Sequence, residues 1–240
     1  MALRTMNSCS RLERPKAWLA WSSGKDSAWA LHTIRQRGEF DIVALLTTVN
    51  QDHQRVAMHA VRESLLDAQA AAAGLPLVKV MIPSSCRNEI YEWAMGEAMA
   101  RTRAEGVVDV VFGDLFLEDI RAYREKQLAN CGMTPIFPLW RRDTRRLAEE
   151  MLAGGLSAYL TCIDSRKLDH VFAGRRFDAD MLAALPSTVD PCGENGEFHT
   201  FACAGPMFRS AIPVAVGETV QRDGFVFADL VPCAAATVTV

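Results

Sequence analysis

The chain has 240 residues, with 26 lysines and arginines against 29 aspartates and glutamates, which gives a formal net charge of −3. Half of the residues are hydrophobic and 23% are charged, a balance typical of a globular protein with one sizeable core. The chain lacks the surplus of Lys and Arg needed to coat a phosphate backbone, and no apolar run approaches the roughly 18 residues of a membrane span. The composition therefore argues against a nucleic-acid partner and against an integral membrane protein.

From Lys16 to about Gly113, short apolar runs rich in β-branched residues alternate with longer stretches of helical period. The apolar runs predict strands at Ala17–Trp21, Asp41–Val49, Leu77–Ile82 and Val107–Phe112. The stretches between them predict a helix over Asp26–Arg37, a helix with its inward stripe at Val61, Leu65, Ala68 and Ala72, and a helix marked by Ile90, Trp93, Ala94 and Ala98. Nearly continuous apolar strands separated by helices are typical of a sheet covered on both faces. We therefore expect an α/β fold with a doubly wound parallel sheet.

The composition of the chain changes after Gly113, where Gly- and Pro-rich segments become frequent. The expected elements are a helix over Glu118–Asn130, a helix from an N-cap at Asp143 to Gly154, a strand over Ser157–Ile163, and a hairpin across Val214–Leu230 that turns at Arg222-Asp223-Gly224. These elements predict a smaller α+β lobe. The expected organisation is a disordered leader over residues 1–15, a sheet domain over 16–115 and a C-terminal lobe over 116–240.

The cysteines carry information about the compartment. The seven cysteines are scattered, and no two of them form a C-x-x-C pair. A zinc site or a disulfide framework requires tighter spacing, and the N-terminal segment has no apolar region of the kind found in secretion signals. We expect free thiols and a cytoplasmic protein.

The first expected strand runs into Ser22-Ser23-Gly24-Lys25-Asp26-Ser27 and then a helix. A helix N-terminus at the carboxyl end of a strand forms an anion site, because its backbone N–H groups and the positive end of its dipole face one place. Serine hydroxyls add donors, and Lys25 adds positive charge for phosphate oxygens. Asp26 carries the same negative charge as a phosphate and so is not expected to contact one. It is better suited to capping the helix or to binding magnesium. The spacing differs from a Walker loop, and an ordinary capped turn is the alternative.

The segment Asp190–Thr200 (DPCGENGEFHT) holds two carboxylates three residues apart, Glu194 and Glu197, separated by Asn195 and Gly196. In a tight turn the two carboxylates can converge on one cation or one ammonium group. Asn and Gly tolerate the left-handed backbone that such a turn requires. From the spacing alone, a solvated acidic loop is an equal alternative.

The loop SSGKDS resembles the pyrophosphate-binding loop of the PP-loop ATP pyrophosphatases, which usually reads S-G-G-K-D-S, with Ser23 in place of a glycine. GENGEFHT resembles the E-G-G-E-[FY]-x-T signature of the diphthine–ammonia ligase family, a branch of that superfamily, with Asn195 in place of a glycine. Blocks similar to that family's intervening segments lie at Arg55–Gln69, Phe112–Glu125 and Phe137–Trp140, so that the resemblance covers nearly all of Lys16–Pro232. It implies a PP-loop, HUP-like sheet domain that binds a nucleotide over 16–115 and an acceptor-binding lobe over 116–240.

The resemblance also implies chemistry and roles. An acceptor carboxylate would be adenylated by ATP with Mg²⁺, releasing pyrophosphate, and ammonia would then displace AMP to form an amide. The implied nucleotide contacts are Ser22, Ser23, Gly24, Lys25, Asp26, Ser27 and His59. Lys25 would stabilise charge on the departing pyrophosphate, and Glu194 and Glu197 would bind ammonium or act as general base. Asp26 and Asp114 are the candidates to hold magnesium. Asp114 could equally be the N-cap of a helix instead of a magnesium ligand. His59 could have a structural role instead of contacting the nucleotide.

Acceptor contacts are expected from Arg121, Glu194, Asn195, Gly196, Glu197 and Thr200. Arg121 and Arg124 are spaced i, i+3 and either read an anionic acceptor or pair with Glu118 and Glu125 on a solvated face. We assign the solvated face to Arg124. Cys192 beside the acidic turn would be the nucleophile of a sulfur-transfer variant, a hypothesis that the lack of a partner thiol weakens.

The expected function is that of an AMP-forming, ATP-dependent amide ligase similar to diphthine–ammonia ligase. Its expected partners are ammonia and a small-molecule or protein-borne carboxylate acceptor, and assembly into a homo-oligomer stays open. One alternative is a PP-loop enzyme that modifies tRNA, against which the missing C-x-x-C pair and the missing basic stripe argue. The other is a nucleotide-binding sensor without turnover, for which the glutamate pair is superfluous.

Overall fold

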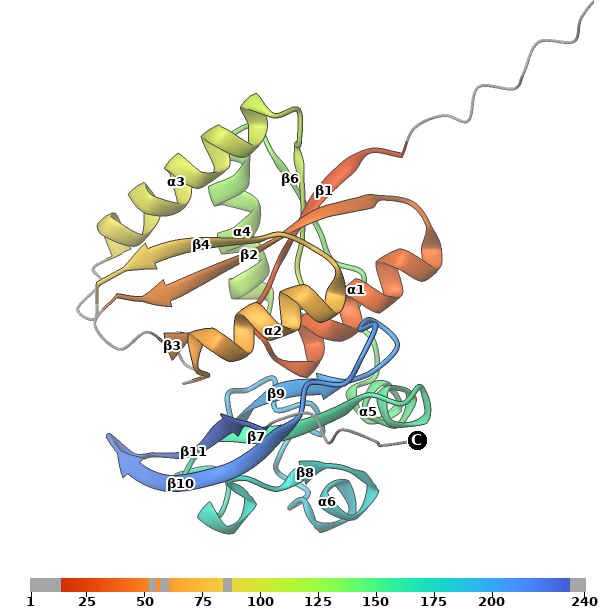
Figure 1. Cartoon of the computed structure of the whole chain (residues 1–240), viewed down its shortest axis with the longest axis vertical. Helices are drawn as coiled ribbons and strands as arrows, with labels where there is room; N and C mark the ends of the chain where they lie inside the picture. Colours follow the sequence, from red (N-terminus) through yellow and green to blue (C-terminus); the bar gives the residue numbers. More distant parts are fainter. Residues whose placement is uncertain (1–13, 52–54, 57–60, 84–87, 234–240) are drawn as a thin grey trace, which may run out of the picture.

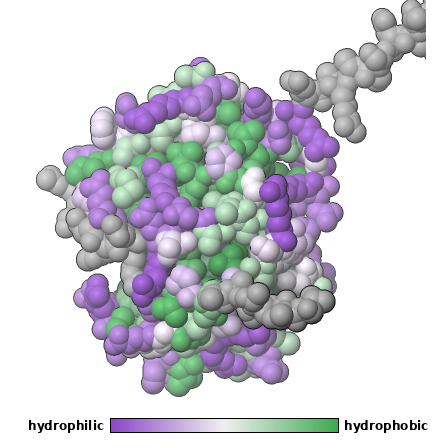
Figure 2. Space-filling model, in the orientation of Figure 1, coloured by the Kyte–Doolittle hydropathy of each residue, from purple (hydrophilic) through white to green (hydrophobic). Residues whose placement is uncertain are grey.

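The computed structural model describes residues 14–51, 55–56, 61–83 and 88–233, and these residues form two β-sheets with helices packed around the first (Figure 1). Most of the expected leader and His59 lie outside the described residues. The face of the molecule in Figure 2 carries hydrophilic and hydrophobic side chains interspersed over both sheets. None of the described helices is long and apolar enough to cross a membrane.

The first sheet is parallel apart from one short strand. Its strands are β1 (Lys16–Ala20), β2 (Asp41–Asn50), β3 (Arg55–Val56), β4 (Leu77–Ile82), β5 (Asp109–Val111) and β6 (Thr134–Ile136). The parallel strands lie in the order β4–β2–β1–β5–β6, and β3 pairs antiparallel with the end of β2. The chain winds outward in one direction from β1 and in the other direction from β5. The carboxyl ends of β1 and β5 therefore flank the crevice in which ligands of such sheets bind.

Helices cover both faces of this sheet: α1 (Lys25–Arg37), α2 (Glu63–Ala73), α3 (Asn88–Ala104) and α4 (Glu118–Asn130). Successive side chains of β1 point to opposite faces, so Leu19 packs with α1 and α2 in one core whereas Trp18 packs with α3 and α4 in another. The expected α/β fold with a doubly wound parallel sheet is confirmed.

The second sheet is antiparallel and has five strands. Its strands are β7 (Ser157–Asp164), β8 (Arg176–Phe177), β9 (Phe198–Ala204), β10 (Val214–Arg222) and β11 (Phe225–Pro232). The helices of this part of the chain are α5 (Thr144–Ala153) and α6 (Ala179–Ala184). The hairpin of β10 and β11 turns at Asp223 and Gly224, whose φ angles of 52° and 80° suit a two-residue turn. Asp143 caps α5 by accepting from the Arg146 N–H at 2.8 Å. The structure confirms both the hairpin and the cap.

The two sheets share a core, because α1 and α2 pack against buried residues of β7 and β9 (Figure 1). The elements of the first sheet extend further along the chain than expected. β6 pairs with β5, and Leu128 of α4 packs in the same core as β5. The strand pairing thus ends the first sheet at Ile136 rather than near residue 115.

On α3, Trp93 is 70% exposed and Ile90 is 40% exposed, so these apolar residues lie outside the core.

Candidate active site

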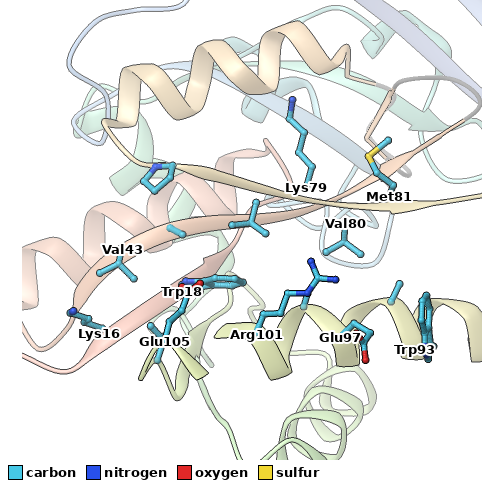
Figure 3. A pocket seen from close by; sticks show the side chains of 16 residues that line it. Lys16, Trp18, Val43, Lys79, Val80, Met81, Trp93, Glu97, Arg101 and Glu105 are labelled. Atoms are coloured by element: carbon cyan, nitrogen blue, oxygen red, sulfur yellow. The ribbon is translucent and has the colours of Figure 1, made fainter. Parts of the chain in front are cut away.

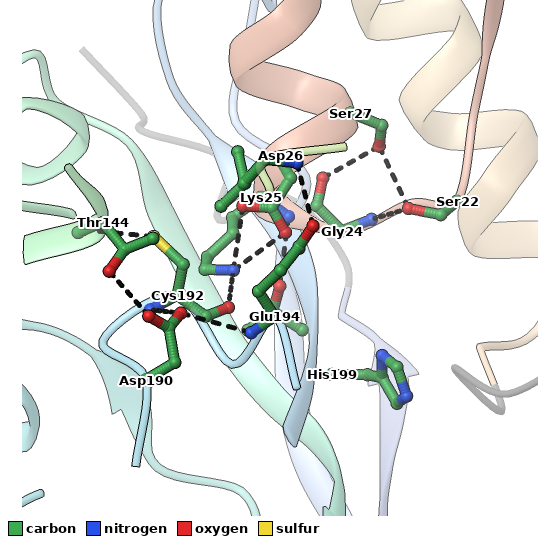
Figure 4. Close-up of polar contacts among 12 residues, drawn as sticks. Ser22, Gly24, Lys25, Asp26, Ser27, Thr144, Asp190, Cys192, Glu194 and His199 are labelled. Atoms are coloured by element: carbon green, nitrogen blue, oxygen red, sulfur yellow. Dashed lines mark hydrogen bonds and ion pairs between the residues drawn. The ribbon is translucent and has the colours of Figure 1, made fainter. Parts of the chain in front are cut away.

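The loop Ser22-Ser23-Gly24 connects the carboxyl end of β1 to the first turn of α1. Gly24 is the N-cap of α1, and it has no side chain to occupy the first-turn N–H groups. The Ser22 hydroxyl accepts from the Gly24 N–H at 3.3 Å and lies 3.2 Å from the hydroxyl of Ser27 (Figure 4). The positive end of the helix dipole is therefore flanked by hydroxyl groups, and its N-cap residue has no capping side chain.

Ser23 holds a left-handed backbone conformation, with a φ of 72°, at the position where the resembled loops have glycine. Its side chain is completely buried, and it does not line the cavity at this loop. The Ser23 carbonyl accepts from the Gln69 amide at 3.0 Å and from the Ala202 N–H at 2.9 Å. Ser23 therefore shapes the loop, and its hydroxyl faces the core.

Lys25 is buried under the loop and only 1% exposed. Its ammonium donates to both oxygens of Asp26, at 3.0 and 2.8 Å, and to the Cys192 carbonyl (Figure 4). The rings of Phe177 and Phe198 lie 5.7 and 5.5 Å from it. Burial alone would lower the pKa of Lys25, but the Asp26 carboxylate outweighs it and holds that pKa above the usual value. The site thus contains an ammonium group fixed at the start of α1 and paired with the Asp26 carboxylate.

The acidic turn before β9 is held from inside by Asp190. The Asp190 carboxylate accepts from the N–H groups of Cys192 and Glu194 at 2.9 and 3.2 Å, and from the Thr144 hydroxyl at 2.6 Å. Gly193 has a φ of 71°, and a Cβ there would lie 2.8 Å from the Phe198 carbonyl. The turn is therefore tightly packed, and its base is tied to the first residue of α5.

Glu194 points out of this turn toward the first sheet. Its Oε1 accepts from the Leu115 N–H at 2.8 Å, just beyond the carboxyl end of β5. Burial, together with the nearby Asp26 carboxylate, raises the pKa of Glu194 to about 7. A carboxyl group with this pKa exchanges protons readily at neutral pH, as a general acid or base must.

Glu197 is 3% exposed and lies in the base of the turn. Its Oε1 accepts from the Asp190 N–H at 3.0 Å and from the Asn195 amide at 3.2 Å. Asn195 is exposed, and its carbonyl accepts from Lys167 at 2.6 Å. The two glutamates therefore differ in position, because Glu194 and Gly196 line the cavity whereas Glu197 and Asn195 do not.

A cavity of about 780 Å³ opens at the crevice between the carboxyl ends of β1 and β5. The expected site residues that line it are Ser22, Lys25, Asp26, Ser27, Asp114, Glu194, Gly196 and Thr200. It extends between α3 and α4, where Tyr91, Met95 and Tyr123 line it. Thr200 joins the two sheets at this point, because its hydroxyl accepts from the Lys25 N–H at 3.0 Å. The structure thus brings the loop of the first sheet and the turn of the second into one cavity.

The two arginines of α4 exchange their expected positions. Arg124, expected on a solvated face, lines the cavity and donates to both oxygens of Asp114, at 2.6 and 3.1 Å. Arg121, expected at the acceptor, donates to Glu125 at 2.7 Å, lies over the Phe137 and Trp140 rings and does not line the cavity. Asp114 is thus paired with an arginine and is not the cap of α4, whose N-cap is Leu117.

The other two candidates near the turn differ in chemistry. Burial raises the pKa of the Cys192 thiol far above its usual value, and its sulfur donates to the Thr144 carbonyl at 3.3 Å. That environment disfavours the thiolate required of a nucleophile. Burial lowers the pKa of His199 to about 4, so its imidazole is neutral at pH 7 where it lines the cavity.

Gly113 is a site residue that the sequence did not single out. It follows β5 and lines the cavity, and a Cβ there would lie 2.8 to 2.9 Å from backbone atoms of Asp26 and Ser27. Only glycine lets the end of β5 approach the first turn of α1 this closely. A glycine directly after a buried strand is the signal that could have identified it.

A second cavity, of about 690 Å³, lies between α3 and the first sheet. Figure 3 shows that Lys16, Trp18, Val43 and Trp93 line it. Lys16 is the first residue of β1, so this cavity begins at the amino ends of the strands. Ligands of parallel sheets bind at the carboxyl ends, which favours the cavity at Lys25 as the reaction site.

Comparison with known proteins agrees with the division into two sheets. Residues 15–135 match the diphthamide synthase N-terminal domain, and residues 143–228 match the diphthamide synthase C-terminal domain. A diphthine–ammonia ligase of Danio rerio is 28% identical over 228 residues, which cover 86% of this chain and 89% of the relative. The Homo sapiens enzyme of that name is 26% identical over 234 residues, covering 86% and 85%. The one of Schizosaccharomyces pombe is 23% identical, covering 84% of this chain and 36% of the relative. This chain belongs to the diphthamide synthase family.

Proposed function

We propose that this chain is an ATP-dependent ligase that joins ammonia to a carboxylate through an adenylated intermediate. A carboxylate oxygen of the acceptor attacks the α-phosphorus of ATP, and the bond to the bridging oxygen of the pyrophosphate breaks. The nitrogen of ammonia then attacks the carbonyl carbon, AMP leaves and the nitrogen loses a proton. The name of the relatives, diphthine–ammonia ligase, supports this reaction type. The acceptor is a small-molecule or protein-borne carboxylate.

The observation that carries the proposal is the meeting of two unlike groups in one cavity. Lys25 and the first turn of α1 supply fixed positive charge, and Glu194 supplies a carboxyl group with a pKa near 7. Positive charge suits a departing pyrophosphate, and a group that exchanges protons suits an incoming amine. Binding both reactants in one cavity also aligns them, which lowers the entropic part of the barrier.

ATP fits the chemistry of the loop. Ser22 and Ser27 present hydroxyl groups beside the N-terminus of α1, and the Gly24 N-cap leaves room for phosphate oxygens. The ammonium of Lys25 is held at the start of α1 by Asp26 and the Cys192 carbonyl, and a phosphate oxygen would take the place of one of these acceptors. The cavity volume of about 780 Å³ lies within the range of small-molecule sites.

Magnesium fits only as a partner of bound phosphate. Among the residues that the structure describes, no three His, Cys, Asp or Glu side chains are placed to hold a metal ion together. Asp26 and Asp114 both line the cavity, and each also pairs with a basic side chain. Mg²⁺ is commonly bound by one or two carboxylates plus phosphate oxygens and water, so these two aspartates would hold it. When bound, the ion would neutralise charge on the phosphates.

Glu194 is the candidate to take the proton that the nitrogen loses. Its contact with the Leu115 N–H fixes the carboxyl group at the end of β5, beside the phosphate loop. Glu197 supports it indirectly, because its bonds to Asp190 and Asn195 hold the turn that carries Glu194. We thus assign the general base to Glu194 and the shape of the turn to Glu197.

Exchange of labelled pyrophosphate into ATP tests the adenylation step without knowledge of the final product. The purified protein is incubated with ATP, magnesium chloride, labelled pyrophosphate and a panel of carboxylates, in the absence of ammonia. We expect at least one carboxylate to support exchange, and added ammonium to divert the intermediate to AMP. Ammonium-dependent AMP formation without any exchange would contradict a reversible adenylated intermediate.

A further inference from the structure

Gln69 is a completely buried amide in the middle of α2, surrounded by apolar residues of the first core. Its Oε1 accepts from the indole N–H of Trp21 at 2.9 Å. Its Nε2 donates to the Ser23 carbonyl at 3.0 Å and to the Ala202 carbonyl at 2.7 Å. One side chain thus connects the end of β1, the phosphate loop and β9 of the second sheet.

The surroundings of this amide permit only one orientation. A flipped amide would place its N–H₂ group against the Trp21 N–H and its oxygen against the carbonyls of Ser23 and Ala202. Both N–H donors of the amide are used, and a buried amide with unmatched partners is strongly disfavoured. The orientation of Gln69 is therefore fixed by the three groups around it.

The Gln69 amide controls which way the loop's N–H groups point. In a planar trans peptide the C=O and the following N–H point in opposite directions. The Ser23 carbonyl is held on the core side by Gln69 and Ala202, so the Gly24 N–H of the same peptide points toward Ser22, which lines the cavity. Ser23 needs this hold, because a serine in left-handed conformation is strained.

We infer that Gln69 is a positioning residue for nucleotide binding, which fixes the Ser23–Gly24 peptide so that its N–H holds the Ser22 hydroxyl at the cavity where the phosphates of ATP would bind. The inference rests on the proposed function, because it takes ATP as the ligand of the loop. Through Ala202, the same amide keeps β9 and its Thr200 in register with the first turn of α1.

The test measures the dissociation constant of ATP by calorimetry, with magnesium chloride present and no acceptor. Gln69→Leu removes all three hydrogen bonds, and we expect it to weaken ATP binding at least tenfold. Leu66→Ala is the matched control, because Leu66 is also completely buried in α2 and makes no polar contact with the loop. We expect the control to lower the unfolding temperature and to leave the dissociation constant unchanged.

Gln69→Glu supplies a second readout if the leucine variant does not fold. The carboxylate keeps an acceptor for Trp21 but turns oxygen toward two carbonyls, whereas the protonated acid restores one donor. We expect its dissociation constant, relative to the wild type at the same pH, to fall as the pH is lowered from 8 to 5. A merely structural residue would show no such recovery. Wild-type affinity for ATP in both Gln69 variants would overturn this inference but not the proposed function. Absence of ATP binding in the wild type would overturn both the inference and the proposed function.

Discussion

Replacing Ser23 by glycine should stabilise the protein, although most substitutions of buried residues destabilise. Ser23 combines a φ of 72° with a completely buried side chain. Its hydroxyl has no hydrogen-bond partner among the described residues. A left-handed conformation costs a non-glycine residue roughly 1–2 kcal/mol, and a buried hydroxyl without a partner costs about 1–3 kcal/mol. Ser23→Gly removes both costs.

Two opposing terms reduce the gain. Glycine loses more conformational freedom on folding, which costs roughly 0.5–1 kcal/mol. The space left by the hydroxymethyl group costs about another 1 kcal/mol, as a small cavity does. Taking the lower ends of the favourable ranges, we expect a net stabilisation of up to about 0.5 kcal/mol, which for a chain of this size raises the unfolding temperature by up to roughly 2 °C.

Urea unfolding measures the free energy of unfolding and differential scanning calorimetry the unfolding temperature, each with and without ATP. Ser22→Gly is the matched control, since the Ser22 hydroxyl accepts from Gly24 and lies beside Ser27, and its loss should destabilise. We expect Ser23→Gly to keep the ATP affinity of the wild type, because Gln69 and Ala202 still hold the same carbonyl. A variant less stable than the wild type would refute the reasoning that Ser23 is strained.

Three further predictions concern the cavity. Burial raises the pKa of Glu194 from 4.5 to about 7, so its contribution to stability is complete below pH 4.5 and is lost as the pH rises through 7. Glu194→Gln should therefore be more stable than the wild type in urea at pH 8, equally stable at pH 4.5, and unable to form the amide. Gly113→Ala should weaken ATP binding at least tenfold, because its Cβ would displace the backbone of Asp26; calorimetry showing unchanged affinity would contradict this close approach. Lys25→Met should lower the rate of AMP formation at least 100-fold and destabilise the fold by roughly 3 kcal/mol, because Asp26 stays without its partner. The exposed Lys126→Met should change neither quantity.

Hydrophobic periodicity was sufficient to predict the sheet and its helices, because buried parallel strands are apolar almost throughout. It was not sufficient at β6, which has three residues. This strand lies in the proline-containing stretch MTPIFPLW. A strand this short is defined by the neighbour with which it pairs and not by its own pattern. The end of the first sheet was for that reason expected too early.

The loop Ser22–Ser27 could be predicted from its contiguous residues, and its binding of phosphate stays a prediction. The contributions of Gln69 and Gly113 were not predicted, since each depends on a partner far along the chain: Ala202 for the first and Asp26 for the second. Arg121 and Arg124 lie on nearly the same face of α4, and small differences in helix rotation decide which of them lines the cavity. The acidic turn posed the same difficulty, because only its three-dimensional path separates Glu194 from Glu197.

The central claim is that the cavity at Lys25 and Glu194 joins ammonia to a carboxylate with cleavage of ATP between its α and β phosphates. The most direct measurement is the nucleotide product, determined by chromatography after incubation with ATP, magnesium chloride, ammonium chloride and a panel of carboxylate acceptors. The account predicts AMP and pyrophosphate in equal amounts, formed only when both an acceptor and ammonium are present. Formation of ADP and inorganic phosphate by the purified protein would contradict it.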